Sequence, residues 1–240
     1  LWFDASQLTG MGGDPVNTWT DLIAGKNATT GSGSPTLTTN ALNGQNVVTF
    51  SGANQDLVVA AGDNPIGGQQ QFTVVVVFRP HAAGANGDGQ WYQNTGLVDA
   101  EQGGATADWG LVWNGNAKVG AGIGAPDQTR YSAAQPLDTG HIAIYTWDGT
   151  SSGIVNLSVD GTTSTTATGP TAARNSYQIL FGRENGTANY FNGDIAEIII
   201  YTTALTTEQV GLVGGYLAEK YELETTYPTA PRAKILTFGP

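Results

Sequence analysis

Three carboxylates near the middle of the chain have the residue types and the spacing that suit chemistry. Asp99 and Glu101 are two residues apart, so on an extended strand their side chains point to the same face. Asp108 follows the turn at Gly103 and Gly104 and can return towards that pair. Calcium takes about six to eight oxygen ligands from carboxylates, carbonyls and water. The spacing therefore predicts a calcium site at Asp99, Glu101 and Asp108, with a solvated acidic hairpin tip as the alternative.

A second set of residues suits the binding of sugars, which needs aromatic rings to stack on a sugar face and polar groups to bond its hydroxyls. Trp91 and Tyr92 lie in the Gly- and Asn-rich segment 83–96, where burial of both rings is less expected. Core packing is the alternative for each ring. The predicted ligand-binding residues are Trp91, Tyr92, Asn94, Asp127, Arg130 and Tyr131, with segments 83–96 and 123–135 as the rim of the site.

A second acidic pair, Asp194 and Glu197, has a spacing that argues against chemistry. Residues three apart lie on opposite faces of a strand, so these two carboxylates cannot act together as an acid and a base. We expect both to be structural, with Glu197 paired to Arg183 or Arg79.

The composition excludes several classes of function. The 240 residues include 20 Asp and Glu against 9 Lys and Arg, a net charge of -11, and nucleic acids require the opposite sign. No apolar run reaches the roughly 18 residues of a membrane span, so we expect no membrane insertion. The chain has no cysteine and only two histidines, without the spacing of a zinc site, so disulfides and thiolate metal sites are excluded.

Short apolar segments separated by Gly and Asn turns predict an all-β sandwich or barrel. Residues 72–79 form a nearly continuous apolar run, which is typical of a strand buried on both faces. The dipeptides Asn114-Gly115 and Asp160-Gly161 are strong hairpin signals. No alternation of helices and strands precedes residue 206.

The folded region is expected to end in one amphipathic helix. Thr206 and Gln209 have the spacing of a capping box. The residues at helical spacing on its apolar face are Val210, Val213, Leu217 and Tyr221. Gly211, Gly214 and Gly215 each weaken a helix by about 1 kcal/mol relative to Ala. The helix therefore depends on packing, or it needs small residues where another segment approaches closely.

The composition changes after residue 223. Residues 224–231 are linker-like, and residues 233–238 look like a strand with nothing to follow it. We predict one domain over residues 1–223, then a linker and an orphan strand over residues 224–240. That strand either begins a next domain, or is an arm, residues 232–238, that adds to a sheet edge of its own or a neighbouring chain and so gives self-association.

Several segments in order resemble the laminin-G-like, concanavalin A-like jelly-roll domains of bacterial surface and secreted proteins. They are residues 1–6 (LWFDAS), 96–99 (GLVD), 108–111 (DWGL), 155–161 (VNLSVDG), 179–183 (ILFGR), 190–197 (YFNGDIAE) and 216–221 (YLAEKY). The resemblance spans residues 1–223. It implies an all-β fold, a two-sheet antiparallel jelly-roll sandwich with one short C-terminal helix.

The resemblance also implies a choice of functions, because members of this family bind glycans or proteins, some bind calcium, and relatives with the same fold are glycosidases or lyases. We expect a non-catalytic extracellular module on a bacterial surface, braced by calcium, that recognises a glycan or a cell-surface protein. A polysaccharide-cleaving enzyme is the first alternative. The family's glycosidases carry the pattern Glu-x-Asp-x-(x)-Glu, of which Asp99-x-Glu101 remains here, and Gln102 begins the segment where the last acid would stand. A structural subunit of a surface layer or filament is the second alternative.

Overall fold

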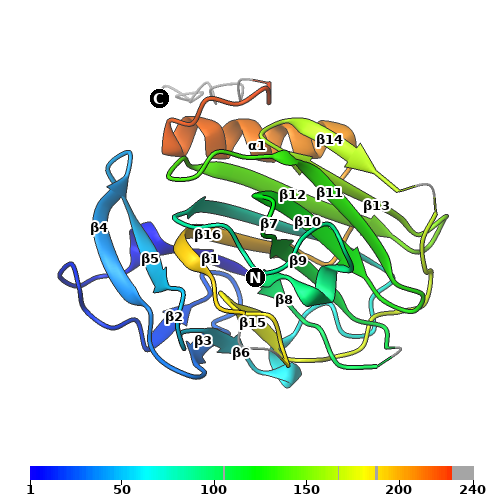
Figure 1. The fold of residues 1–240 in the computed structure, drawn as a ribbon, viewed down its shortest axis with the longest axis horizontal. Helices are drawn as coiled ribbons and strands as arrows, with labels where there is room; N and C mark the ends of the chain where they lie inside the picture. The colour runs from blue at the N-terminus through cyan, green and yellow to red at the C-terminus, as the bar shows by residue number, and fades with distance from the viewer. Residues whose placement is uncertain (105, 167, 187–188, 229–240) are drawn as a thin grey trace, which may run out of the picture.

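The computed structural model describes residues 1–104, 106–166, 168–186 and 189–228. These residues form two antiparallel sheets packed face to face, with one α-helix (Figure 1). The predicted strand at residues 233–238, and with it the proposed pairing arm, lies outside the described residues. Among the described residues, no helix has the length and apolar character that crossing a bilayer requires.

Sheet A contains β1 (Trp2–Asp4), β4 (Thr36–Leu42), β5 (Gln45–Ser51), β7 (Gln71–Pro80), β12 (His141–Asp148), β13 (Ile154–Val159), β14 (Thr162–Thr165) and β16 (Asn192–Tyr201). Sheet B contains β2 (Thr18–Thr20), β3 (Asn27–Thr30), β6 (Leu57–Val59), β8 (Thr95–Asp99), β9 (Trp109–Trp113), β10 (Lys118–Ile123), β11 (Gln128–Ala134) and β15 (Ile179–Phe181). The helices are α1 (Thr207–Tyr221) and the short 3-10 turns η1 (Ala5–Gln7), η2 (Ala61–Asp63) and η3 (Trp91–Gln93).

The strand order makes each sheet a single antiparallel layer. Sheet A runs β14-β13-β12-β7-β16-β5-β4, with β1 paired to β16. Sheet B runs β11-β10-β9-β8-β15-β6-β3-β2. The predicted fold class, an all-β two-sheet sandwich of the jelly-roll type with a single C-terminal helix, is therefore confirmed.

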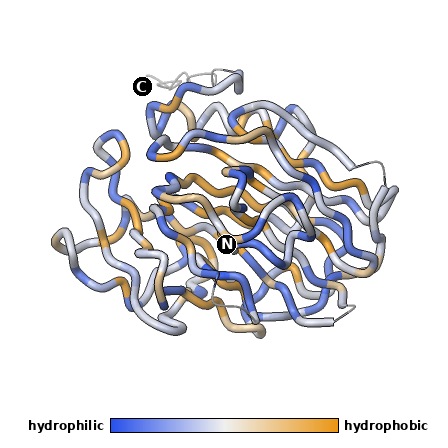
Figure 2. Tube along the Cα trace, in the orientation of Figure 1, coloured by the Kyte–Doolittle hydropathy of each residue, from blue (hydrophilic) through white to orange (hydrophobic). Residues whose placement is uncertain are grey.

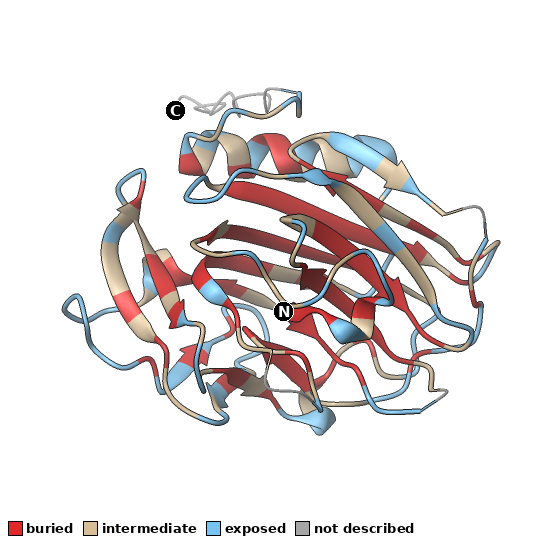
Figure 3. Ribbon diagram, viewed as in Figure 1, coloured by how far each residue is buried: buried red, intermediate tan, exposed pale blue. Residues whose placement is uncertain are grey.

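The central strand β7 is buried on both faces. Phe72, Val74, Val76 and Phe78 face the core between the sheets, while Val75 and Val77 face outwards beneath α1. Apolar residues recur along the strands of both sheets (Figure 2), and the strands at the centre of the sandwich are buried throughout (Figure 3). The helix is the reason that β7 reads as a continuous apolar run, because it covers the outer face of sheet A.

The helix begins where the sequence predicts. The Thr206 hydroxyl accepts a hydrogen bond from the Gln209 amide at 3.3 Å, and the Gln209 side chain accepts one from the Thr206 amide at 2.9 Å. Leu217 and Tyr221 are buried against Val75 and the neighbouring outward residues of sheet A. The capping box satisfies backbone amides that the first turn of a helix leaves without partners.

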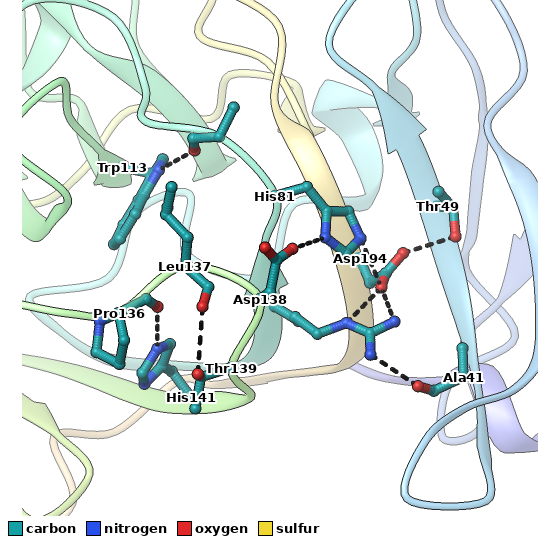
Figure 4. Close-up of polar contacts among 12 residues, drawn as sticks. Ala41, Thr49, His81, Trp113, Pro136, Leu137, Asp138, Thr139, His141 and Asp194 are labelled. Atoms are coloured by element: carbon teal, nitrogen blue, oxygen red, sulfur yellow. Dashed lines mark hydrogen bonds and ion pairs between the residues drawn. The ribbon is translucent and has the colours of Figure 1, made fainter.

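Asp194 and Glu197 both have structural partners, but the prediction that they lie on opposite faces of the strand is wrong. A β-bulge between Ile195 and Glu197 shifts the register, so both acids lie on the outer face of sheet A, opposite Arg79 and Val77 of β7. Asp194 is buried and receives hydrogen bonds from Arg79 at 2.5 and 2.9 Å and from the Thr49 hydroxyl at 2.7 Å, with His81 at 3.1 Å (Figure 4). Glu197 pairs with Lys220 at 2.6 Å, not with Arg183 or Arg79. Lys220 of α1 therefore supplies the positive charge that balances Glu197 on β16.

Candidate functional site

On the outer face of sheet B, two aromatic rings pack directly against glycines of the strands. On β9, Trp109 and Leu111 face the core, so Gly110 between them faces outwards. A Cβ atom at Gly110 would lie 2.6 Å from the indole of Trp91, and one at Gly122 would overlap the same indole. The sheet can accept the indole only because these positions have no side chain. A third glycine, Gly120 on β10, makes room for the ring of Tyr131 in the same way.

Trp91 is consequently not a stacking surface for a ligand. Its side chain is fully buried, which corrects the prediction of a ligand-binding ring at this position. The neighbouring Tyr92 stays half-buried and packs edge-on against Trp91, with ring centroids 5.9 Å apart. The segment thus places one ring in the protein and leaves the other partly exposed above it.

Asn94 and Tyr131 are brought to the same place, where they hold the segment down. Asn94 is fully buried, which corrects the prediction that it meets a ligand, and its amide lies 2.6 Å from the Tyr131 hydroxyl. That hydroxyl donates to the Gly89 carbonyl at 3.0 Å. The Trp91 amide also donates to the Thr129 hydroxyl at 3.2 Å. These contacts tie η3 to β11 and position Tyr92.

Asp127 and Arg130 complete the predicted set, and both are exposed. Asp127 lies in the turn between β10 and β11, close enough for its charge to act on Glu101. Arg130 alternates with Tyr131 along β11, so its side chain leaves the strand on the other side. Of the two, Asp127 belongs to the same end of sheet B as the acidic residues.

Asp99 is the last residue of β8 and is fully buried. Its Oδ1 atom accepts hydrogen bonds from the backbone amides of Glu101 at 3.0 Å and Asn185 at 3.3 Å. Among the described residues its Oδ2 atom has no hydrogen-bond partner, and it would lie 2.5 Å from a Cβ at Gly110, beside the Trp91 indole. Burial raises the pKa of Asp99 well above its usual range, so the group favours its neutral form.

Glu101 meets an acid that the sequence did not suggest. Glu184, which follows β15, is buried and shares a side-chain hydrogen bond with Glu101. Burial, followed by the charge of Glu184 and this hydrogen bond, raises the pKa of Glu101 to about 8. Two carboxyls in contact share a proton because the doubly ionised pair repels. No local spacing marks Glu184, which is brought to Glu101 by the crossing of segment 183–185 over β8.

Asp108 closes the turn that links β8 to β9. Its Oδ2 atom accepts from the Gln102 amide at 3.0 Å and from the Thr106 hydroxyl at 2.8 Å. Burial raises the pKa of Asp108. Behind the turn, the buried guanidinium of Arg174 donates to the carbonyls of Asp108 at 3.2 Å and Gly124 at 2.8 Å. The turn is thus held by hydrogen bonds within the protein.

The predicted calcium ligands therefore lie at one end of sheet B, and backbone amides already bond one oxygen of Asp99 and one of Asp108. Among the described ranges, no three His, Asp or Glu side chains are grouped as a metal site. The unpartnered Asp99 Oδ2 and the proton-sharing pair of Glu101 and Glu184 are the oxygens that a hard cation would have to use. Calcium at Asp99, Glu101 and Asp108 stays a prediction.

Solved structures share this fold at low sequence identity, while no curated protein sequence matches the chain. The binding domain of Paraclostridial Mosquitocidal Protein 1 has a TM-score of 0.63 at 12% identity, over 86% of this chain and 51% of that chain. Trypanosoma rangeli sialidase in complex with sialic acid has a TM-score of 0.61 at 15% identity, over 91% and 32%. Domain 4 of AbnA, a GH43 extracellular arabinanase from Geobacillus stearothermophilus, in complex with arabinotriose, has a TM-score of 0.52 at 18% identity, over 75% and 87%.

The chain spans about half the length of the toxin binding domain that it matches. At these identities the likeness concerns the fold. A family model provides the sequence-level relation, and it covers the strands from the end of β5 to the first part of α1. This model, Laminin_G_3, described as the concanavalin A-like lectin/glucanases superfamily, matches residues 51–211, and the chain belongs to that family.

Proposed function

We propose that this domain is a non-catalytic, glycan-binding module of an extracellular protein. The observation that carries the proposal is the position of Tyr92, whose ring packs edge-on against the buried Trp91 and stays partly exposed on the outer side of sheet B. A fixed aromatic ring loses little conformational freedom when it stacks on a ligand. Sugar hydroxyls then need polar partners, which the exposed Asp127 and the slightly exposed Glu101 supply.

The charge of the chain favours a neutral glycan over an anionic one. The net charge is -11, and the acids at this end of the sheet would repel a sialic acid carboxylate. Of the structural neighbours, domain 4 of the arabinanase is described in complex with arabinotriose, a neutral sugar. We therefore propose neutral polysaccharide chains as the ligand class, with a cell-surface protein as the alternative partner.

The burial of the acids supports binding rather than cleavage. A general acid or base must come within hydrogen-bond reach of the substrate. Asp99 is fully buried, and its Oδ1 atom is occupied by two backbone amides. Glu101 is 9% exposed and shares its hydrogen bond with Glu184. A substrate would have to displace the Trp91 indole to reach Asp99.

Calcium belongs to this proposal as a brace and not as a reactive group. The donors at the end of β8 are all oxygens, which suit calcium better than zinc. The unpartnered Asp99 Oδ2 is the oxygen that most needs a cation or a proton. When bound, calcium would replace the proton on these carboxyls and hold the turn from residue 100 to residue 108 against segment 184–186.

The test is isothermal titration of the chain with arabino-oligosaccharides, gluco-oligosaccharides and sialyllactose, with and without calcium. Tyr92→Ala should weaken binding at least tenfold. Tyr216→Ala is the matched control, because Tyr216 is 46% exposed on α1, over the opposite sheet. The proposal is wrong if no neutral glycan binds, or if both variants bind as the wild type does. Release of reducing sugar that Glu101→Gln abolishes would establish the enzyme alternative instead.

A further inference from the structure

The residues directly after α1 lie in a groove between the helix and the hairpin of β13 and β14. The Thr226 amide donates to the Asp160 carbonyl at 2.9 Å, in the turn of that hairpin. The Tyr227 hydroxyl donates to the Ser158 hydroxyl at 3.1 Å, and the Tyr227 side chain packs against the outer cluster of sheet A. Residues 224–228, which by composition resemble a linker, are therefore in contact with both the helix and the sheet.

Residues 226–228 pass close to glycines both on α1 and in the turn between β13 and β14. A Cβ atom at Gly214 of α1 would overlap the ring of Tyr227, and one at Gly211 would lie 3.2 Å from Pro228. In the hairpin turn, a Cβ atom at Gly161 would overlap Thr226. A glycine inside a helix costs about 1 kcal/mol relative to Ala, so two of them on one helix face need a packing reason. The close approach of residues 226–228 is that reason.

The environment of Tyr227 agrees with a docked segment. Burial raises the pKa of the Tyr227 hydroxyl to about 12, as expected for a phenol held between a helix and a sheet. The direction of the chain is also defined, because Tyr227 contacts Gly214 and Pro228 contacts Gly211. The segment runs back along α1 towards the start of the helix.

We propose that residues 224–228 are a strap that clamps α1 to sheet A and fixes the point and direction in which the chain leaves the domain. A free linker samples many directions, whereas a docked strap allows one. The strap lies on the outer face of sheet A, and Tyr92 lies on the outer face of sheet B. The clamp thus holds residues 224–228 on the side of the molecule opposite to the candidate binding face.

The first test is a double-mutant cycle of Gly214→Ala and Tyr227→Ala, read by thermal melting of the full chain. Ala is the better helix former, so Gly214→Ala should raise Tm once the Tyr227 ring is gone. In the wild-type background the new methyl group meets the ring, and the same substitution should lower Tm or leave it unchanged. An equal rise in Tm in both backgrounds would overturn the proposal, because it would mean that the ring is not docked on the helix.

The second test uses the absence of native cysteines. The double variant Gly211→Cys, Pro228→Cys should form a disulfide readily. A Cβ atom at position 211 would lie 3.2 Å from the ring of Pro228. Tyr216→Cys with Pro228→Cys is the control pair, because Tyr216 lies on another side of the helix and lines a different groove. The expected result is at least tenfold faster oxidation of the first pair. Equal rates for the two pairs would contradict a fixed strap.

Discussion

Replacing Glu101 by glutamine is predicted to flatten the pH dependence of stability between about pH 5 and pH 8. The pKa of a glutamate is 4.5 in an unfolded chain, and burial together with Glu184 raises that of Glu101 to about 8 in the fold. Between these values the folded protein holds a proton that the unfolded chain has released. The free energy of unfolding therefore falls as the pH rises, and the stability present at pH 4.5 is lost by pH 8.

The magnitude follows from this one proton. Stability changes by at most about 1.36 kcal/mol for each pH unit, so about 5 kcal/mol is the upper limit across the interval; solvent screening at Glu101 and the coupling to Glu184 reduce it. Asp99 and Asp108 also have raised pKa values and act in the same direction, so the variant should lose part of the slope and keep the rest. Glutamine is neutral throughout and can still donate a hydrogen bond to Glu184.

The assay is urea denaturation at pH 5, 6, 7 and 8, followed by the fluorescence of the six tryptophans. Asp88→Asn is the control, because hydrogen bonds from Lys118 and Asn116 lower the pKa of Asp88 and keep it ionised over this range. That variant should change the level of stability but not its slope. If Glu101→Gln keeps the full wild-type slope, Glu101 does not carry the proton and the reasoning fails.

Three further predictions concern the parts around this site. Arg174→Met should cost about 2–4 kcal/mol in urea denaturation, because the buried guanidinium binds two carbonyls and lies 4.5 Å over the Trp147 ring; a cost below 1 kcal/mol would contradict that role. Chelation should lower Tm by about 5–10 °C at pH 8 and less at pH 5, since protons compete with calcium for carboxylates, whereas an unchanged Tm would remove calcium from the proposal. Thr206→Ala should cost about 1 kcal/mol in urea denaturation by removing the cap of α1, and Thr207→Ala, just inside the helix, is the control that should cost less.

The parts of the fold that the sequence predicts are those with local signals. The capping box of Thr206 and Gln209 lies within one helical turn, and the continuous apolar run of residues 72–79 needs only its own composition to indicate a doubly buried strand. These signals do not depend on which strands become neighbours. The strand-rich pattern and the single terminal helix were predictable for the same reason.

The candidate site depends on contacts between residues far apart in the chain. Glu184 acts on Glu101 only because the segment after β15 crosses β8, and the spacing of acids within one segment cannot indicate such a crossing. Asp99, Glu101 and Asp108 lie at one end of sheet B, but not for the predicted reason, because β8 ends at Asp99 and Glu101 lies beyond the strand. The spacing also could not show that backbone amides already occupy two of their oxygens.

The burial of Trp91 had a signal in the sequence, but the signal lies in β9 and β10 rather than in the segment that carries Trp91. Glycine weakens a strand, so Gly110 and Gly122 inside two adjacent strands indicate that another group approaches the sheet closely there. The approaching group is Trp91, which the nearby Gly- and Asn-rich segment carries. Gly211 and Gly214 in α1 follow the same logic, with Pro228 and Tyr227 as the approaching groups. In both places the glycines, rather than the aromatic residues, identify the surface that a segment of the chain covers.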